Sequence, residues 1–146
     1  MGSDVARTLA LDIGTERVGV AISDPLGTSA QPGPTLSRSP DEVFFGSLAD
    51  LLKEWGVTEV VVGLPRGLSG QQGESAKAVL ALVTEFERRW PDIRWSTWDE
   101  RFTTRAADQA LRSAPKKTRR RKGLRDRIAA QLILEGYLRF RQTRGG

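Results

Sequence analysis

The stretch Thr58–Gly63 constrains the fold of this chain more than any other part. It is rich in valine, as is typical of a strand that is buried on both faces of a sheet, and it leads into the glycine-rich loop Leu64–Gly73. A strand of this kind has neighbouring strands on both sides and helices covering the sheet. We therefore predict that Thr58–Gly63 is a central parallel strand of an α/β domain.

An antiparallel hairpin is predicted near the start of the chain. Thr8–Ile13 is apolar apart from Asp12, and Arg17–Ile22 has the alternation of a strand. Gly14 lies between the two segments and favours a tight turn. A third, short strand is expected within Pro25–Ser39.

Four segments have apolar residues at the spacing expected of helices. A last strand, Ile93–Trp98, is predicted between the second and the third of these helices. The first segment has the start signal of a helix, in which Ser39 is the N-cap and Pro40 is the first helical residue. Glu42 completes the capping box by accepting a hydrogen bond from the backbone N–H of the N-cap. The predicted helices span residues 40–55, 75–90, 103–114 and 124–140. The order of elements predicts one α/β domain with a mixed sheet of five strands, three antiparallel and then parallel ones, flanked by helices.

The composition excludes several kinds of chemistry. The chain of 146 residues has no histidine and no cysteine, so it has no imidazole base, no serine-histidine triad, no thiolate nucleophile and no zinc site of the usual type. No apolar run approaches the roughly 20 residues that are needed to span a bilayer. We expect a soluble cytoplasmic protein that does not bind membranes.

Positive charge is concentrated in the last quarter of the chain. Residues 113–146 hold 11 of the 23 basic residues but only 2 of the 18 acidic residues. Such a segment attracts polyanions, and a nucleic-acid backbone is the most abundant one in a cytoplasm. The competing interpretation is a solubilising tail. The densest part of the segment comprises Lys116, Lys117, Arg119, Arg120, Arg121 and Lys122.

Three acidic residues are candidate metal ligands. Asp12 lies inside an apolar strand, Glu100 follows another strand, and Asp126 stands beside the basic stretch. Carboxylates that converge in a fold can hold Mg²⁺ or Mn²⁺. Each also has a structural interpretation, since Asp12 could form a turn, Glu100 could pair with a neighbouring arginine, and Asp126 could stabilise a helix N-terminus.

Five segments together resemble the YqgF/RuvX family, whose members have an RNase H-like fold and are related to Holliday junction resolvases. The segments cover nearly the whole chain in the family's order, and the most specific one is Asp99-Glu100-Arg101-Phe102-Thr103-Thr104. The matching residues in these segments are 10–15, then 17–21 with 23–24, then 61–65, then 99–104, and finally Asp126 with 129–130 and 133–134.

This resemblance implies a single RNase H-like nuclease domain over residues 1–146, with a flexible basic loop at 114–123. It implies that Asp12, Glu100 and Asp126 are the catalytic carboxylates and that they bind Mg²⁺ or Mn²⁺, with two ions expected. The implied substrate is structured nucleic acid, either branched DNA or the 5′ end of precursor 16S rRNA. Cleavage of a four-way junction requires two symmetric cuts, so a homodimer is expected in that case.

Contacts to the phosphate backbone are expected from basic and hydroxyl-bearing residues. These are Arg17, Arg66, Arg101, Thr104, Lys116, Lys117, Arg119, Arg120, Arg121 and Lys122. The chain departs from the family pattern at three positions, with Gly67 and Ser69 in the glycine-rich loop and Glu16 before Arg17. These departures put the substrate contacts of that loop in doubt and leave the three acids unchanged.

Two other function classes stay open from the sequence. A non-catalytic RNA-binding factor for ribosome maturation would keep the fold and the basic loop. An ATP-binding protein of the actin, chaperone or sugar-kinase type also begins with a strand and Asp-x-Gly-Thr, but those proteins close two such lobes around ATP. The residues favour neither branched DNA nor precursor rRNA, because both present the same phosphates.

Overall fold

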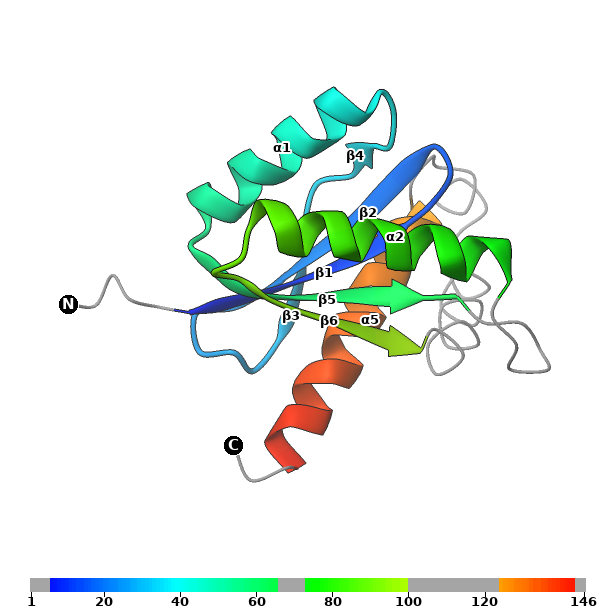
Figure 1. Cartoon of the computed structure of the whole chain (residues 1–146). Helices are drawn as coiled ribbons and strands as arrows, with labels where there is room; N and C mark the ends of the chain where they lie inside the picture. Colours follow the sequence, from blue (N-terminus) through cyan, green and yellow to red (C-terminus); the bar gives the residue numbers. More distant parts are fainter. Residues whose placement is uncertain (1–5, 66–72, 100–123, 144–146) are drawn as a thin grey trace.

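The computed structural model describes residues 6–65, 73–99 and 124–143, which form one mixed sheet between two helical layers (Figure 1). In the sheet, β1 (Arg7–Ile13) lies between β2 (Arg17–Ser23), which is antiparallel to it, and β5 (Val57–Leu64), which is parallel to it. The strand β6 (Arg94–Asp99) continues the parallel half beyond β5. The predicted central position of the valine-rich strand is confirmed, as is the mixed sheet.

The third strand that was predicted within Pro25–Ser39 consists of two short pieces. β3 (Ala30–Pro32) and β4 (Leu36–Ser37) both pair with β2, at different parts of its length. Among the described residues the sheet therefore has six strands in five positions, in the order β3-β2-β1-β5-β6 with β4 beside β2.

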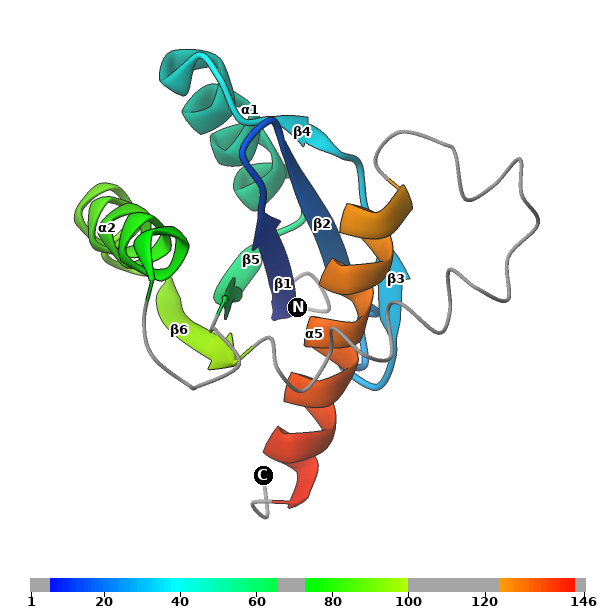
Figure 2. The ribbon, with the colours of Figure 1, turned by 90° about the vertical axis from the view of Figure 1, so that its right-hand side faces the viewer.

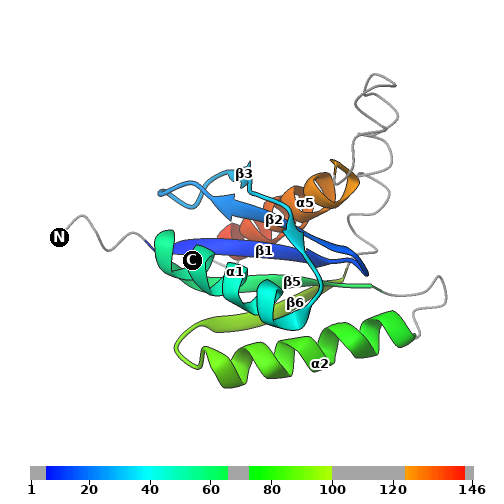
Figure 3. The same ribbon diagram turned by 90° about the horizontal axis from the view of Figure 1, so that it is seen from above.

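Among the described residues, two helices cover one face of the sheet and one covers the other. α1 (Asp41–Glu54) and α2 (Glu74–Arg89) lie together on the first face, and α5 (Leu124–Thr143) crosses the second (Figures 2 and 3). These three helices agree with the predicted ones. The helix predicted at 103–114 and the loop predicted at 114–123 lie outside the described residues. None of the described helices is long and apolar enough to cross a membrane.

The two faces of the sheet differ in side-chain size. Leu9 and Leu11 of β1 point toward α1 and α2 and join a core that includes three phenylalanines and three partly buried tryptophans. On the α5 face the strands present small residues, so that α5 packs directly on the sheet. The buried residues of this smaller core are Ala10, Ala21, Ala30, Val61, Ala130, Ile133, Leu134 and Leu138. The alternation of side chains along β1 places its neighbouring residues on opposite faces.

The start of α1 differs from the prediction. Pro40, not Ser39, is the N-cap residue, and no side chain forms a cap hydrogen bond. The carbonyl of Pro40 accepts hydrogen bonds from the N–H groups of Val43 and Phe44, each at 3.1 Å. This one-residue shift moves the Ser39 hydroxyl out of the N-cap position, so the predicted capping box is wrong. The helix ends as expected, since Gly56 adopts φ +58°, the left-handed conformation that glycine allows.

Candidate active site

The C-terminal ends of three parallel strands lie at one edge of the sheet. β1, β5 and β6 are mutually parallel and end at Ile13, Leu64 and Asp99 (Figure 1). In open α/β sheets, ligands bind in the crevice beyond this edge. A cavity of about 660 Å³ opens there on the α1 and α2 side, lined in part by Gly14, Thr15 and Pro65.

Asp12 is at this edge and on the face that α5 covers. It is the next-to-last residue of β1 and stands two positions after Ala10, which is buried in the core beneath α5. Because side chains alternate along a strand, Asp12 shares the face of Ala10. Its pairing partner on β2 is Gly19, and the register of β5 brings Gly63 beside it on the other strand. The residues that face Asp12 directly on the two neighbouring strands are therefore glycines, and Asp12 is half-buried.

Asp126 belongs to the first turn of the helix on this same face. It is the third residue of α5, and α5 begins on the side of the molecule toward which β1, β5 and β6 point (Figures 1 and 3). The structure therefore brings the backbone positions of Asp12 and Asp126 to the same face and the same end of the sheet. The side chain of Asp126 and the whole of Glu100 lie outside what the structure describes.

Arg17 is the one predicted phosphate contact within the described part of the chain. It is the first residue of β2 and alternates with Gly19 and Ala21, so it shares the α5 face with Asp12. Its guanidinium lies 3.4 Å from the Glu16 carboxylate, and this pair is exposed, so it contributes little to stability. The other predicted contacts, at positions 66, 101, 104, 116, 117 and 119–122, fall outside the described residues.

The turn between β1 and β2 is tight because of Gly14. Its N–H donates a 2.8 Å hydrogen bond to the carbonyl of Arg17, and a Cβ atom at position 14 would lie 2.6 Å from that carbonyl oxygen. Backbone atoms cannot yield as a flexible side chain can. The sequence prediction of a tight turn at Gly14 is therefore confirmed.

We predict that Gly14→Ala destabilises the domain by about 1 to 3 kcal/mol, because the added methyl group must push the two strands apart. Thermal unfolding followed by circular dichroism measures the loss. Gly73→Ala is the control, since a Cβ atom there meets nothing within 4 Å and the change should cost less than about 1 kcal/mol, as expected for alanine at the N-cap of α2. Equal stability of the two variants would contradict the assigned turn geometry.

Two residues of the resembling segments lie at the opposite edge. β2 is antiparallel to β1, so its last residue, Ser23, is remote from Asp12. The Ser23 hydroxyl accepts a hydrogen bond from the Thr8 N–H. Asp24 accepts hydrogen bonds from the N–H groups of Ser29 and Thr28, and the Ser29 bond is the main cause that lowers the pKa of Asp24. These two residues hold the loop after β2 and do not belong to the candidate site.

A buried polar cluster, which the sequence pattern did not predict, lies at this opposite edge. Glu59 of β5 is 6% exposed, and on the α5 face it meets Thr8, Tyr137 and Arg141. Arg141 donates a 2.7 Å bond to the Glu59 carboxylate and a 3.0 Å bond to the Thr8 hydroxyl, and the Tyr137 hydroxyl also donates to Glu59. We call these four residues the Glu59 cluster.

The Glu59 cluster fixes the C-terminal half of α5 on the sheet. Tyr137 and Arg141 are four residues apart and therefore lie on one side of the helix. Burial, followed by the hydrogen bond to Glu59, raises the pKa of Tyr137 and keeps its hydroxyl protonated as a donor. The sequence feature that could have revealed this cluster is Glu59, the single acidic residue in the valine-rich strand. The apolar residues around it obscure this feature.

The donors of the predicted site suit a hard divalent cation. They are carboxylates, and the chain has no histidine or cysteine that would favour zinc or copper. Within the described ranges no three acidic side chains gather into a group that could hold a metal ion. The predicted trio includes Glu100 and the side chain of Asp126, which are not described, so its convergence stays a prediction.

Comparison with known proteins identifies the family. The family model for RuvX, described as Holliday junction resolvase, matches residues 6–140. The chain belongs to the RuvX family. Among curated RuvX relatives, proteins named "Putative pre-16S rRNA nuclease" from Halalkalibacterium halodurans and Lachnospira eligens are 41% and 39% identical to it. The matches span 94% and 93% of this chain and 99% of each relative.

Solved structures show the RNase H-like fold of resolvases. Thermus thermophilus RuvC bound to a Holliday junction superposes with a TM-score of 0.56 at 17% identity, over 92% of this chain and 96% of that one. The fowlpox virus resolvase, bound to Holliday junction DNA, superposes with a TM-score of 0.58 at 12% identity, over 92% and 97%. At these identities the likeness establishes the fold alone.

Proposed function

We propose that this RuvX-family protein is a divalent-metal-dependent endonuclease that hydrolyses phosphodiester bonds in structured nucleic acid. Asp12, Glu100 and Asp126 are its catalytic carboxylates and bind Mg²⁺ or Mn²⁺. The observation that carries the proposal is that Asp12 and the first turn of α5 lie on one face and at one edge of the sheet. Two acidic positions that are 114 residues apart in the sequence are thereby brought to the same region.

The pattern of β6 supports Glu100 as the third member. Trp98 packs in the core beneath α5, where its ring contacts Tyr137 and Phe140. Side chains alternate along a strand, so a strand extended by one residue past Asp99 would present Glu100 on the face of Trp98. This is also the face of Asp12.

The chemistry follows from the absence of other catalytic groups. With no histidine or cysteine, the chain offers carboxylates to hold ions and arginines and lysines to hold phosphates. A bound pair of divalent ions supplies an activated water and stabilises the leaving oxygen. Asp12, half-buried and opposite glycines on β2 and β5, lies at the base of the site. Arg17 neutralises phosphate on the same face.

The substrate is precursor 16S rRNA or a DNA junction, and the names of the relatives favour the first of these. Proteins about 40% identical over nearly their whole length are named for the rRNA activity. We place the protein in the cytoplasm, where ribosome maturation and DNA repair take place. If the substrate is a four-way junction, the active form is a homodimer.

One experiment tests the proposal directly. A synthetic four-way junction and a precursor 16S rRNA fragment are incubated with the protein, with and without Mg²⁺ or Mn²⁺. Metal-dependent cleavage of either substrate supports a nuclease and identifies the preferred one. Tight binding of the RNA with no cleavage under any condition would instead support the second candidate, a non-catalytic RNA-binding factor.

The basic segment predicts a strong dependence of binding on salt. Neutralising its six cations should flatten the slope of log K against log salt by up to roughly 5, because each phosphate contact contributes about 0.7 to 0.9. Fluorescence anisotropy over a salt series measures the slope. The six changed residues are Lys116, Lys117, Arg119, Arg120, Arg121 and Lys122.

The control for this measurement neutralises cations elsewhere. Lys53, Lys77 and Arg139 are exposed on the described helices. Their joint replacement by glutamine should leave the slope nearly unchanged. An equal effect of both sets would show that net charge, and not the basic segment, governs binding.

A further inference from the structure

The cavity beside the ends of β1 and β5 has no part in the proposed chemistry. Its volume of about 660 Å³ lies within the range of roughly 300 to 1,000 Å³ that is typical of ligand pockets. Ile13 lines it and directly follows Asp12 in β1, so the two side chains point to opposite faces of the sheet. The cavity and the candidate active site therefore lie back to back at one edge, the cavity on the α1 and α2 side and the active site on the α5 side.

The lining of the cavity combines apolar side chains with hydrogen-bonding groups. The apolar side chains are buried or half-buried and belong to Ile13, Val79 and Leu82. The hydrogen-bonding groups are exposed hydroxyls and one carboxylate, from Thr15, Ser39, Ser75 and Glu74. Within the part of the chain that the structure describes, these four side chains form no hydrogen bond or ion pair. A flat ring that carries N–H and carbonyl groups, such as a nucleobase, fits a lining of this kind.

The charges around the cavity favour a base over a phosphate group. Arg38 is the single cation among the described lining residues, and its guanidinium lies 2.7 Å from the Asp41 carboxylate. Asp41 and Glu74 belong to the first turns of α1 and α2, where they offset the positive ends of the helix dipoles. The remaining carboxylate, that of Glu74, repels phosphate but accepts hydrogen bonds from the N–H groups of a base.

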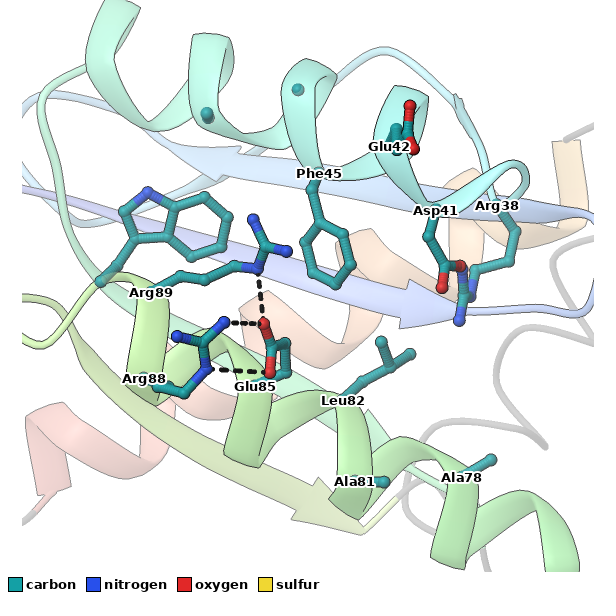
Figure 4. Close-up of a pocket in the computed structure, with 13 residues that line it drawn as sticks. Arg38, Asp41, Glu42, Phe45, Ala78, Ala81, Leu82, Glu85, Arg88 and Arg89 are labelled. Atoms are coloured by element: carbon teal, nitrogen blue, oxygen red, sulfur yellow. Dashed lines mark hydrogen bonds and ion pairs between the residues drawn. The ribbon is translucent and has the colours of Figure 1, made fainter.

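A groove of about 1130 Å³ between α1 and α2 adjoins the cavity (Figure 4). The residues that line both are Arg38, Asp41, Ala78 and Leu82. Ala81, about one turn further along α2, lines the groove alone. Ala78 and Ala81 are both exposed, so each position accepts a larger side chain without disturbing the core. The cavity can therefore be filled from Ala78, with Ala81 as the reference position.

We propose that the cavity holds an unpaired base of the nucleic-acid substrate, close to the phosphate that is cleaved. This assignment rests on the proposed function, because a strand bound at Asp12 delivers the base. The strand passes over the turn at Gly14 and Thr15, which lines the cavity, and one base points inward. A base that is stacked in a duplex does not reach such a pocket, so the substrate offers an unpaired nucleotide beside the cleavage site.

The test measures binding of a precursor 16S rRNA fragment without metal, by fluorescence anisotropy. One abasic nucleotide is moved step by step along the unpaired strand of the RNA. In the wild type, the missing base should weaken binding at least about tenfold at one position, as expected when an apolar pocket loses its occupant. Ala78→Trp should bind the intact RNA more weakly by a similar factor, because its indole fills the cavity. The abasic nucleotide should then cause no further loss.

Ala81→Trp is the matched control, since it adds the same indole to the same helix outside the cavity. This variant should respond to the abasic nucleotide as the wild type does. Ser75→Phe fills the cavity from a second exposed position and repeats the test if Ala78→Trp does not fold. Circular dichroism verifies the fold of each variant.

Three results would overturn the proposal. They are a scan in which no missing base weakens binding, an equal loss at that position in the wild type and in Ala78→Trp, and an Ala81→Trp variant that behaves as Ala78→Trp does. Because binding is measured without metal, the outcome is separate from nuclease activity. A protein that shows the expected coupling and never cleaves would keep the base pocket and contradict the nuclease. Cleavage without any effect of the missing base would contradict the pocket alone.

Discussion

Asp12→Asn should lower metal-dependent cleavage by at least about a thousandfold, which corresponds to roughly 4 kcal/mol of lost transition-state stabilisation. The amide keeps the size of the carboxylate but loses the charge that holds a divalent cation. Because Asp12 is only half-buried and its neighbours on β2 and β5 are glycines, the change leaves the core intact. Single-turnover cleavage of the junction and of the precursor rRNA measures the effect.

Two controls make this result specific. Asp50→Asn is the same chemical change at an exposed position of α1 and should cleave as the wild type does. Binding of substrate to Asp12→Asn without metal should be unchanged or slightly tighter, because one negative charge near the phosphates is lost. Cleavage that persists in Asp12→Asn would place the chemistry at other residues.

The layers of the fold could be predicted from local sequence because burial dictates the pattern. A run of valines such as Val60–Val62 is typical of a strand with both faces covered. Asp12 is the single charged residue of Thr8–Ile13, which predicted a special role for it. The structure confirms the position of that strand beside β5 and shows which face Asp12 occupies. The catalytic assignment of Asp12 comes from the resemblance and stays a prediction.

The features that were missed depend on contacts between distant residues. Glu59 bonds to Tyr137 and Arg141, which are 78 and 82 residues away in sequence, so no local pattern reveals the pair. The start of α1 was misplaced by one residue because Pro40 is the N-cap and contributes through its backbone carbonyl, with no side-chain cap hydrogen bond. The α1–α2 groove likewise exists only after two helices pack on one sheet.

Glu59→Leu should have the largest effect on stability, a loss of about 2 to 3 kcal/mol. Removing one member of a buried ion pair costs roughly 3 to 5 kcal/mol, because the other charge is left without its partner. The Arg141 side chain is 38% exposed and can reach water, which places the expected loss at or below the lower end of that range. For a domain of this size the melting temperature should fall by roughly 10 °C, measured by differential scanning calorimetry.

Removing the charges of both Glu59 and Arg141 distinguishes the contribution of their ion pair to stability from the contribution of side-chain packing. In Glu59→Leu with Arg141→Leu no unpaired charge remains, so the double variant should be more stable than Glu59→Leu alone. If Glu59→Leu were as stable as the wild type, the cost of burying the carboxylate would equal the gain from its partners. The cluster would then fix the position of α5 along the sheet without adding to the stability of the domain. This position brings the first turn of α5, which contains Asp126, to the edge of the sheet where Asp12 lies.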